Sequence, residues 1–358
     1  MLKTIIPFGP QHPVLPEPLH LKLTVEDEII TGVFPALGFV HRGLEQLVHI
    51  RDFQQMIQVV ERVCGICSMI HATCYCQGIE ALMEIDPPPR AKFLRTLWCE
   101  VHRIQSHLLW LGLFADCFGF ESLFMQFWKI REKVLDINEA TTGNRVIVSV
   151  NVIGGVRRDL STEQMQWTCS ELSWVQNEIA CLKATLLSDY TVKKRTVGKG
   201  VLSKDKAFEL GAVGPTARAS GIAQDMRLLG YSALDQLDFE PVVETDGDCY
   251  ARSKVRFQEV LQSIDLIRQA VSRMPAGEIR TKFKGRPAGE MFVRVEQPRG
   301  ELFYYIKANG TKHLERLRIR TPTFANIPAL LGMLPGMWLS DVPVVVLSID
   351  PCISCTER

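Results

Sequence analysis

The sequence predicts an α+β protein that is mainly helical, with a central bundle of long helices and small antiparallel sheets near the N-terminus and in the C-terminal third. Three observations support this prediction. Residues 1–40 contain the period-two alternation of strands, residues 44–275 repeat apolar side chains at helical spacing, and strand-like runs return in residues 290–358. No internal repeat or low-complexity linker divides the 358 residues, so we expect one domain.

The N-terminal region is expected to form short strands, because Leu19 to Val25 alternates apolar with polar or mixed side chains. A helix is then expected from Leu44 to about Val63, followed by a tight turn at Gly65. A second helix should run from Ser68 to about Met83, and Asp86 with the prolines after it should end that helix.

The longest helix should start at the prolines 87–89, because a proline in the first helical turn lacks only an N–H that would be unpaired anyway. Apolar residues recur along it at helical spacing from Phe93 to Leu111. Further helices are expected at about 119–140, 162–190 and 252–273.

The last part of the chain, residues 290–358, is expected to be β-rich before a buried metal-binding segment. Met291–Val295 and Leu302–Ile306 are strand-like and flank a Pro-Arg-Gly turn at 298–300, which predicts a hairpin. A short apolar run, Val344–Leu347, precedes the final cysteines.

Composition excludes several classes of protein. Hydrophobic residues make up 46% and charged residues 23% of the chain, as in a globular protein with a sizeable core. The 41 basic and 40 acidic residues form no basic block, so nucleic-acid binding is not expected. We expect no export signal and no membrane-spanning segment, because no uncharged apolar run of about 18 residues is present. The 11 cysteines are then expected to be thiols or metal ligands in a reducing compartment.

Two Cys-x-x-Cys pairs lie almost a chain length apart: Cys64 with Cys67, and Cys352 with Cys355. Four thiolates in two chelating pairs can hold a soft or borderline metal ion. The fold must then bring both pairs to one point. We expect the sulfurs of Cys67 and Cys355 to lie within about 4 Å of each other, and the segment 344–358 to be buried.

The cysteines alone leave more than one kind of site open. A structural zinc site normally has about 12–20 residues between its pairs, and a thioredoxin-like site has a single pair, so both fit poorly. A cubane iron–sulfur cluster is compatible with the four thiols on chemistry alone. The remaining cysteines are expected to be buried packing residues: Cys74, Cys76, Cys99, Cys117, Cys169, Cys181 and Cys249.

The surroundings of the two pairs carry a resemblance to a known family. Arg62-x-Cys64-Gly65-x-Cys67 with His71, and Asp350-Pro351-Cys352-x-x-Cys355, resemble the paired signatures of the large subunit of NiFe-hydrogenases. His41–Glu45 resembles the Arg-Gly-x-Glu element of that family, and Glu296–Gly300 resembles its Pro-Arg-Gly element. The resemblance covers essentially the whole chain.

A second resemblance narrows the branch of the family. Gly9–Pro13, Gly214–Gly221 and Thr321–Asn326 resemble the quinone-site, 49-kDa subunit of respiratory complex I, which lacks the four metal-binding cysteines. Both feature sets together are similar to the membrane-bound, energy-converting hydrogenases of the Ech or CO-induced type. His12 lies in the first of these elements and could serve proton transfer or only the fold, so it is not assigned to catalysis.

The resemblance implies a nickel and an iron ion in one site, with CO and cyanide on the iron. Cys64 and Cys352 would be terminal nickel ligands, and Cys67 and Cys355 would bridge nickel to iron, because soft sulfur donors suit low-valent nickel. H2 would be cleaved heterolytically, with Cys352 as the first base and Glu45 next. Glu45 would relay protons if partial burial raises its pKa, although by itself it is an ordinary acid for a first helical turn.

The resemblance assigns five further residues to the cofactor site: Pro298, Arg299, Thr323, His71 and Asp350. Arg299, next to Pro298, would border the open metal position or bind a cyanide nitrogen, because a guanidinium stays charged and offers several donors. Thr323 would hydrogen-bond the other cyanide, His71 would donate to a bridging cysteine, and Asp350 would orient the final loop. From the residues alone, an arginine after a proline in a turn is more often a solvated loop residue, and His71 could equally be a packing histidine.

One position departs from the family pattern. Arg358 stands where most uptake hydrogenases have a histidine, and arginine is no metal ligand, which argues against the magnesium ion of that family. No other cysteines have iron–sulfur spacing, so the resemblance implies a small subunit with a 4Fe–4S cluster, ferredoxin as electron partner, and integral membrane subunits that move ions. The chain would be peripheral, on the cytoplasmic side of the cell membrane. The alternative is a complex I-like coupling or scaffold subunit without hydrogen chemistry.

Overall fold

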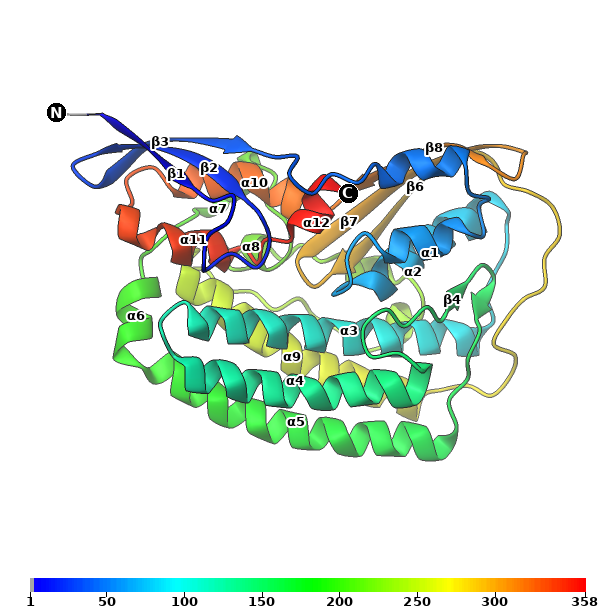
Figure 1. Ribbon diagram of the computed structural model, residues 1–358. Helices are drawn as coiled ribbons and strands as arrows, with labels where there is room; N and C mark the ends of the chain where they lie inside the picture. The colour runs from blue at the N-terminus through cyan, green and yellow to red at the C-terminus, as the bar shows by residue number, and fades with distance from the viewer. Residues whose placement is uncertain (1–2) are drawn as a thin grey trace.

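The computed structural model describes residues 3–358, in which a layer of long helices lies beneath two small sheets and a group of short helices (Figure 1). The long helices are α3 (Pro89–Asp116), α4 (Glu121–Thr142), α5 (Thr162–Ser188) and α9 (Cys249–Ser272). α3 packs against α4 and α9, and α5 packs against the same two helices. The predicted helical bundle is confirmed, and its helix starting at the prolines is the longest one described.

The sheets are small and antiparallel, as predicted. The N-terminal sheet has the order β1 (Thr4–Phe8), β2 (His20–Glu26), β3 (Ile29–Ala36). The second sheet has the order β6 (Ala288–Gln297), β7 (Gly300–Asn309), β8 (Leu314–Arg320). β4 (Asn151–Val152) pairs only with β5 (Gly155–Val156).

Short helices surround these sheets, and α2 packs against β6 and β7. The α-helices are α1 (Met56–Glu61), α2 (Ser68–Leu82), α6 (Tyr190–Thr196), α7 (Lys204–Glu209), α8 (Gly214–Arg218), α10 (Pro322–Met333), α11 (Val342–Ser348) and α12 (Ile353–Glu357). The 3₁₀ helices are η1 (Leu44–His49), η2 (Met226–Leu229), η3 (Leu234–Gln236) and η4 (Leu339–Asp341).

Two expectations about secondary structure are wrong. The single helix expected from Leu44 to Val63 is split into η1 and α1, because Asp52 Oδ1 accepts hydrogen bonds from the N–H groups of Gln54 and Gln55 at 2.9 and 2.8 Å and begins a new turn. The β-rich character expected for residues 290–358 ends at Arg320, since α10, α11 and α12 follow. The burial expected for 344–358 is confirmed, with only Ser354 and Arg358 partly exposed.

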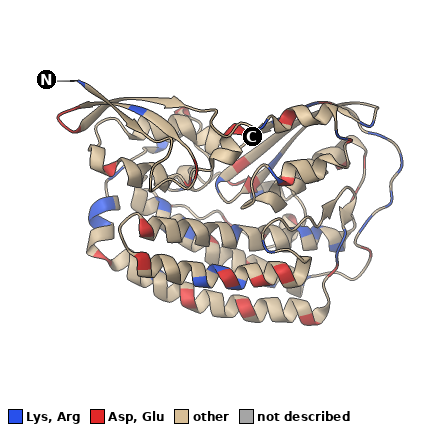
Figure 2. Cartoon of the chain, in the orientation of Figure 1, with Lys and Arg blue, Asp and Glu red and all other residues tan. Residues whose placement is uncertain are grey.

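Charged residues are interspersed along the long helices (Figure 2), and some of them are buried. α3 is buried on nearly all sides, so its charged residues Arg95, Glu100 and Arg103 need partners inside the protein. Arg95 has one in Glu80 on α2, at 2.6 Å. Over residues 3–358, the helices lack the combination of length and apolar character that would let one cross a membrane.

Candidate metal centre

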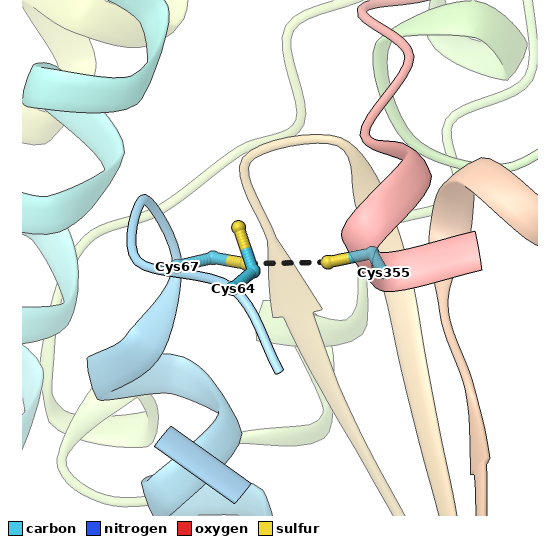
Figure 3. A group of neighbouring side chains, drawn as sticks. All are labelled: Cys64, Cys67 and Cys355. Atoms are coloured by element: carbon cyan, nitrogen blue, oxygen red, sulfur yellow. Dashed lines mark hydrogen bonds between the residues drawn. The ribbon is translucent and has the colours of Figure 1, made fainter. Parts of the chain in front are cut away.

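The four cysteines of the two pairs meet in the interior. Cys64 lies between α1 and α2, Cys67 directly precedes α2, Cys352 directly precedes α12, and Cys355 lies in α12. The Sγ atoms of Cys67 and Cys355 are 3.7 Å apart, and those of Cys64 and Cys352 are 3.5 Å apart. The sulfurs of Cys64, Cys67 and Cys355 all lie within 4.8 Å of one another (Figure 3). The predicted approach of Cys67 to Cys355 is confirmed.

These separations and charges fit a bound metal. Sulfurs that share one metal at bonds of about 2.3 Å lie about 3.8 Å apart in a tetrahedron. Hydrogen bonds from the neighbouring thiols, first that of Cys352, lower the pKa of Cys64. Burial raises the pKa of Cys67, and hydrogen bonds with Cys355 and Cys64 raise the pKa of Cys352. The protein alone therefore favours one thiolate, and a multivalent cation would allow the other thiols to ionise.

Arg299 joins the β6–β7 turn to the loop before Cys352. Its Nε donates to the carbonyl of Asp350 at 2.9 Å, and its Nη2 lies 2.8 Å from the Asp350 carboxylate. Its Nη1 donates to Ser106 Oγ on α3 at 3.3 Å. Burial opposes the charge, but Asp350 and the nearby cysteines outweigh it and raise the pKa of Arg299. The result is a permanent positive charge beside the sulfurs.

Two glycines allow the Arg299 turn to approach α8. A Cβ on Gly214 would lie 2.3 Å from the Arg299 carbonyl oxygen, and a Cβ on Gly300 would lie 2.7 Å from Gly214 N. Both glycines have positive φ, +65° and +129°. β6 and β7 pair up to Gln297 and Gly300, which leaves Pro298 and Arg299, both buried, as the turn. The two sequence elements that contain these glycines therefore pack backbone against backbone.

His71 lies on α2, one turn after Cys67, and contacts the other pair. Its Nε2 is 3.6 Å from Cys355 Sγ, and its Nδ1 is 2.7 Å from the Tyr304 hydroxyl on β7. Burial lowers the pKa of His71 to about 4, so the ring is neutral. A neutral ring that accepts from Tyr304 at Nδ1 carries its proton on Nε2 and can donate it to the sulfur.

Threonines of α10 and its N-cap hold the second cysteine pair. Thr323 Oγ1 accepts a hydrogen bond from Cys352 N–H at 3.2 Å, which leaves the hydroxyl proton free for another acceptor. Thr321 Oγ1 donates to the carbonyl of Cys355 at 2.8 Å. The two ends of the Cys352–Cys355 segment are thus tied to one helix start.

Sequence reasoning missed two side chains that also hold this segment. The Glu17 carboxylate accepts hydrogen bonds from the N–H groups of Ile353 and Ser354, the latter at 3.1 Å. Arg42 Nη2 donates to the carbonyls of Val63 at 2.7 Å and Ser354 at 3.1 Å, and so joins the two cysteine segments directly. Arg42 belongs to the His41–Glu45 element, which was a usable signal, whereas nothing in the sequence marks Glu17.

Glu45 is an ion-paired carboxylate at the edge of the site. It accepts hydrogen bonds at 2.9 Å from Ile319 N–H, from Arg318 Nη1 and from Arg358 Nε. Burial would raise the pKa of Glu45, but the Ile319 N–H and the two guanidinium groups outweigh it, and the pKa is lowered. The raised pKa predicted for Glu45 is therefore wrong.

Tyr304, the hydrogen-bond partner of His71, stays protonated. Burial, with the nearby cysteines and Glu45, raises the pKa of Tyr304.

Several other expected residues lie elsewhere. His12 stacks on Phe8, with ring centroids 4.3 Å apart, and its Nδ1 accepts from Val14 N–H at 3.3 Å. Cys74, Cys76, Cys99 and Cys249 are buried as expected for packing residues. The expectation is wrong for three others, because Cys117 and Cys169 are only partly buried and Cys181, on the outward side of α5, is exposed.

Two family profiles match different parts of the chain. The family described as "Respiratory-chain NADH dehydrogenase, 49 Kd subunit" matches residues 117–286 and 281–358. The family described as "Nickel-dependent hydrogenase" matches residues 42–113. The 49-kDa subunit profile covers Cys352 and Cys355, and the nickel-dependent hydrogenase profile covers Cys64 and Cys67.

Three relatives are similar over nearly the whole chain. The carbon monoxide-induced hydrogenase of Rhodospirillum rubrum is 42% identical over 99% of this chain and 99% of its own length. The membrane-bound hydrogenase subunit alpha of Pyrococcus furiosus is 38% identical over 99% of this chain and 87% of its own length. An F420H2 dehydrogenase subunit of Methanosarcina mazei is 36% identical over 99% of this chain and 97% of its own length.

Proposed function

The chain belongs to the family that unites the large subunits of nickel-dependent, energy-converting hydrogenases with the 49-kDa subunit of respiratory-chain NADH dehydrogenase, and we propose that it is the catalytic subunit of an energy-converting NiFe-hydrogenase. It would catalyse the reversible heterolytic cleavage of H2, coupled to ferredoxin and to ion movement across a membrane. The observation that carries this proposal is the convergence of four buried thiols from the two ends of the described chain.

The four cysteine sulfurs would hold the metal ions. A nickel–iron centre, with CO and cyanide on the iron, would supply the redox chemistry when bound. Cys64 and Cys352 would hold nickel as terminal ligands, and Cys67 and Cys355 would bridge nickel and iron. His71 would keep Cys355 oriented through its Nε2, which lies 3.6 Å from the sulfur.

The turn residues would shape the open side of the site. Arg299 would place a fixed positive charge there, and Asp350 would hold both the guanidinium and the loop before Cys352. Pro298 would exclude water at the turn. Thr323 would direct its free hydroxyl proton to a metal-bound cyanide, because its oxygen already accepts from Cys352 N–H.

Protons would leave in two steps. The Cys352 sulfur would accept the first proton, and Glu45 would pass it outward. Glu45 is held in its ionised form by Arg318 and Arg358, and the ionised form is the one that can accept a proton. A transient proton on Glu45 would be released quickly, because these two arginines favour the carboxylate.

Electron transfer requires partners in this proposal. They would be a small subunit with a 4Fe–4S cluster, ferredoxin beyond it, and integral membrane subunits. The Pyrococcus furiosus relative is named as a subunit of a membrane-bound hydrogenase, which supports a peripheral position in such a complex. We place the chain on the cytoplasmic side of the membrane.

A second candidate function is a coupling subunit of a complex I-like assembly without hydrogen chemistry. The Methanosarcina mazei relative favours it, because the name F420H2 dehydrogenase specifies a different electron donor. The four buried thiols favour the hydrogenase, since a coupling scaffold has no use for two converging pairs.

Metal analysis combined with infrared spectroscopy separates the two candidates. The purified complex should contain nickel and iron and should show infrared bands of CO and cyanide on iron. A Cys352→Ser variant serves as the control and should lose nickel together with these bands. Zinc alone, without nickel and without diatomic ligand bands, would refute the hydrogenase proposal.

A further inference from the structure

A buried tyrosine connects the Arg299 hairpin to the cysteine sulfurs. Tyr304 follows the turn on β7, which is the central strand of its sheet. The backbone of Tyr304 is paired with Val293 on β6 and with Ile319 on β8, and its side chain is fully buried. Both neighbouring strands therefore fix the position from which the Tyr304 hydroxyl acts.

The Tyr304 hydroxyl meets His71 where α2 packs against the sheet. Helix and strand are in close contact there, because a Cβ on Gly78 of α2 would lie 2.5 Å from Ile306 Cδ1 on β7. The Tyr304 hydroxyl is 2.7 Å from His71 Nδ1, and His71 Nε2 is 3.6 Å from Cys355 Sγ. One buried imidazole ring thus spans the distance from the Tyr304 hydroxyl to a sulfur of the candidate metal centre.

Two arrangements of protons are compatible with this row of three groups. A neutral imidazole has one N–H and one bare nitrogen, so both hydrogen bonds must run in the same direction along the row. In the first arrangement, Tyr304 donates to His71 Nδ1, and His71 Nε2–H donates to the Cys355 sulfur. In the second arrangement, His71 Nδ1–H donates to the Tyr304 oxygen, and the Cys355 thiol donates to Nε2. The positions of the heavy atoms are the same in both.

The surroundings of the Tyr304 hydroxyl select the first arrangement. Within residues 3–358, His71 Nδ1 is the one hydrogen-bond partner of this hydroxyl. The nearby thiol of Cys74 is directed at the carbonyl of Val293, 3.8 Å away. The second arrangement would therefore bury the hydroxyl proton without an acceptor, which costs more than an ordinary hydrogen bond contributes. The first arrangement leaves only a thiol proton without a strong acceptor, and a thiol is a weak donor.

The first arrangement is also the one that suits a metal-bound sulfur. A thiolate has no proton and can only accept a hydrogen bond, so Nε2 must carry the proton when Cys355 is a ligand. The Tyr304 hydroxyl imposes the same tautomer on His71 in the metal-free chain. His71 therefore keeps its tautomer and its ring orientation when a metal binds, and this preorganisation reduces the cost of binding.

We propose that Tyr304 is a positioning residue of the metal centre, which sets the tautomer of His71 before a metal binds and so gives the Cys355 sulfur a fixed hydrogen-bond donor. The effect of Tyr304 on hydrogen chemistry rests on the proposed function, whereas its effect on His71 does not. The β6–β7 hairpin then serves the centre twice, with the positive charge of Arg299 at its turn and with the Tyr304 hydroxyl on its second strand.

The tautomer of His71 can be measured in the full-length chain without any metal. ¹⁵N NMR distinguishes a ring nitrogen that carries a proton from a bare one, and a His71→Gln variant identifies the signals of His71. We expect the proton on Nε2 in the wild-type chain. Tyr304→Phe keeps the aromatic ring and loses only the hydroxyl, so the ratio of the Nε2–H form to the Nδ1–H form should fall about tenfold, the scale of one buried hydrogen bond.

Tyr75→Phe is the matched control. Tyr75 lies on α2, is fully buried, and donates its hydroxyl to the carbonyl of Phe53 over the same distance, 2.7 Å. Loss of that hydrogen bond should leave the tautomer of His71 unchanged. A fluorinated tyrosine at position 304 is a stronger donor of nearly the same size, so it should move the ¹⁵N signal of His71 Nδ1 further from that of a free bare nitrogen. This second variant tests the same bond if Tyr304→Phe does not fold.

Infrared spectroscopy of the assembled complex tests the link from Tyr304 to the sulfur. A weaker bond from Nε2–H leaves more electron density on the Cys355 sulfur and on the iron, so the CO stretch should move to lower frequency in Tyr304→Phe and stay in place in Tyr75→Phe. A wild-type chain with the proton on Nδ1, an unchanged tautomer ratio in Tyr304→Phe, or an unshifted CO band in that variant would each overturn the role of Tyr304. A complex that lacks nickel and CO bands, while the tautomer of His71 still depends on Tyr304, would refute the proposed function alone.

Discussion

The two cysteine pairs reach the same point by different means. The first pair, Cys64 and Cys67, lies in the turn between α1 and α2, so two adjacent helices fix its place. The second pair, Cys352 and Cys355, depends on side chains from the N-terminal region and from α10. The first pair has the two adjacent helices in addition to side-chain hydrogen bonds, from Gln105 to the Ile66 carbonyl and from Arg42 to the Val63 carbonyl, whereas the second pair relies mainly on hydrogen bonds from residues distant in sequence. The second pair should therefore respond more strongly to the loss of a single polar contact.

Removing a sulfur should have the largest effect, and the loss of metal and activity should be the same for either pair. Cys64→Ser and Cys352→Ser should each abolish nickel retention and H2 turnover, because a neutral hydroxyl is a poor substitute for a thiolate. Metal analysis of the purified complexes measures this. Cys181→Ser, at an exposed position outside the site, is the control and should keep both properties. Normal nickel in Cys64→Ser would contradict a shared four-sulfur site.

The next effect concerns the proton route beside the second pair. Glu45→Gln preserves size and most hydrogen bonding but removes ionisation, so metal should still assemble. Solvent H/D exchange and turnover should fall about 100-fold, the scale of a positioned acid–base group. Arg299→Lys should instead disturb the metal chemistry, because a point charge cannot reproduce the guanidinium fork. Wild-type exchange in a fully metallated Glu45→Gln sample would show that protons leave by another path.

Loss of the Glu17 contact should loosen the second pair and spare the first. Glu17→Ala removes the acceptor for the N–H groups of Ile353 and Ser354. Hydrogen bonds to a charged group contribute about 1.5–3 kcal/mol, so local opening of the second pair should increase about 10- to 100-fold. Amide hydrogen exchange at Ile353 measures this opening. Equal acceleration at His71, after the first pair, would contradict the comparison.

The sequence predicted the parts of the site that are encoded locally. The cysteine spacing, the helix after Cys67 and the Pro-Arg-Gly hairpin follow from patterns within a few residues, and the structure contains them. The contacts from Glu17 and Arg42 to the second pair span more than 300 residues, and no local pattern reports such a pairing. The apolar residues between Leu44 and Val63 do recur at helical spacing, but the spacing did not reveal where the helix is interrupted. The hydrogen bonds to Asp52 begin a new turn there and divide the predicted helix in two.

Changes in pH should act on the two pairs in opposite directions. The pKa of Glu45 is lowered from its ordinary value of 4.5, so its stabilisation of Arg318 and Arg358 is present above that value and lost as pH falls further. The pKa of Glu61, just before the first pair, is raised, mainly by burial, so its stabilisation is present below 4.5 and lost as pH rises through the folded-state value. Hydrogen exchange measured on both sides of pH 4.5 should show loosening near Arg358 as pH falls below that value, and loosening near Ser149, which donates to Glu61, as pH rises above it.

The smallest expected effect compares one neutral hydrogen bond at each pair. Thr323→Val keeps the shape of the side chain but removes the acceptor for Cys352 N–H, and Ser68→Ala removes a bond of similar length, 3.2 Å, from the start of α2 to the Val146 carbonyl. A neutral hydrogen bond contributes about 1 kcal/mol, which corresponds to about a fivefold change in local opening. We expect that change at Cys352 in Thr323→Val, together with faster nickel loss to a chelator. In Ser68→Ala the N–H of His71 retains the Cys67 carbonyl as its acceptor, at 3.2 Å, so His71 should stay protected and nickel loss should be unchanged. If Ser68→Ala releases nickel as fast as Thr323→Val, the first pair also depends on individual side-chain contacts, and the distinction between helix-held and side-chain-held ligands fails.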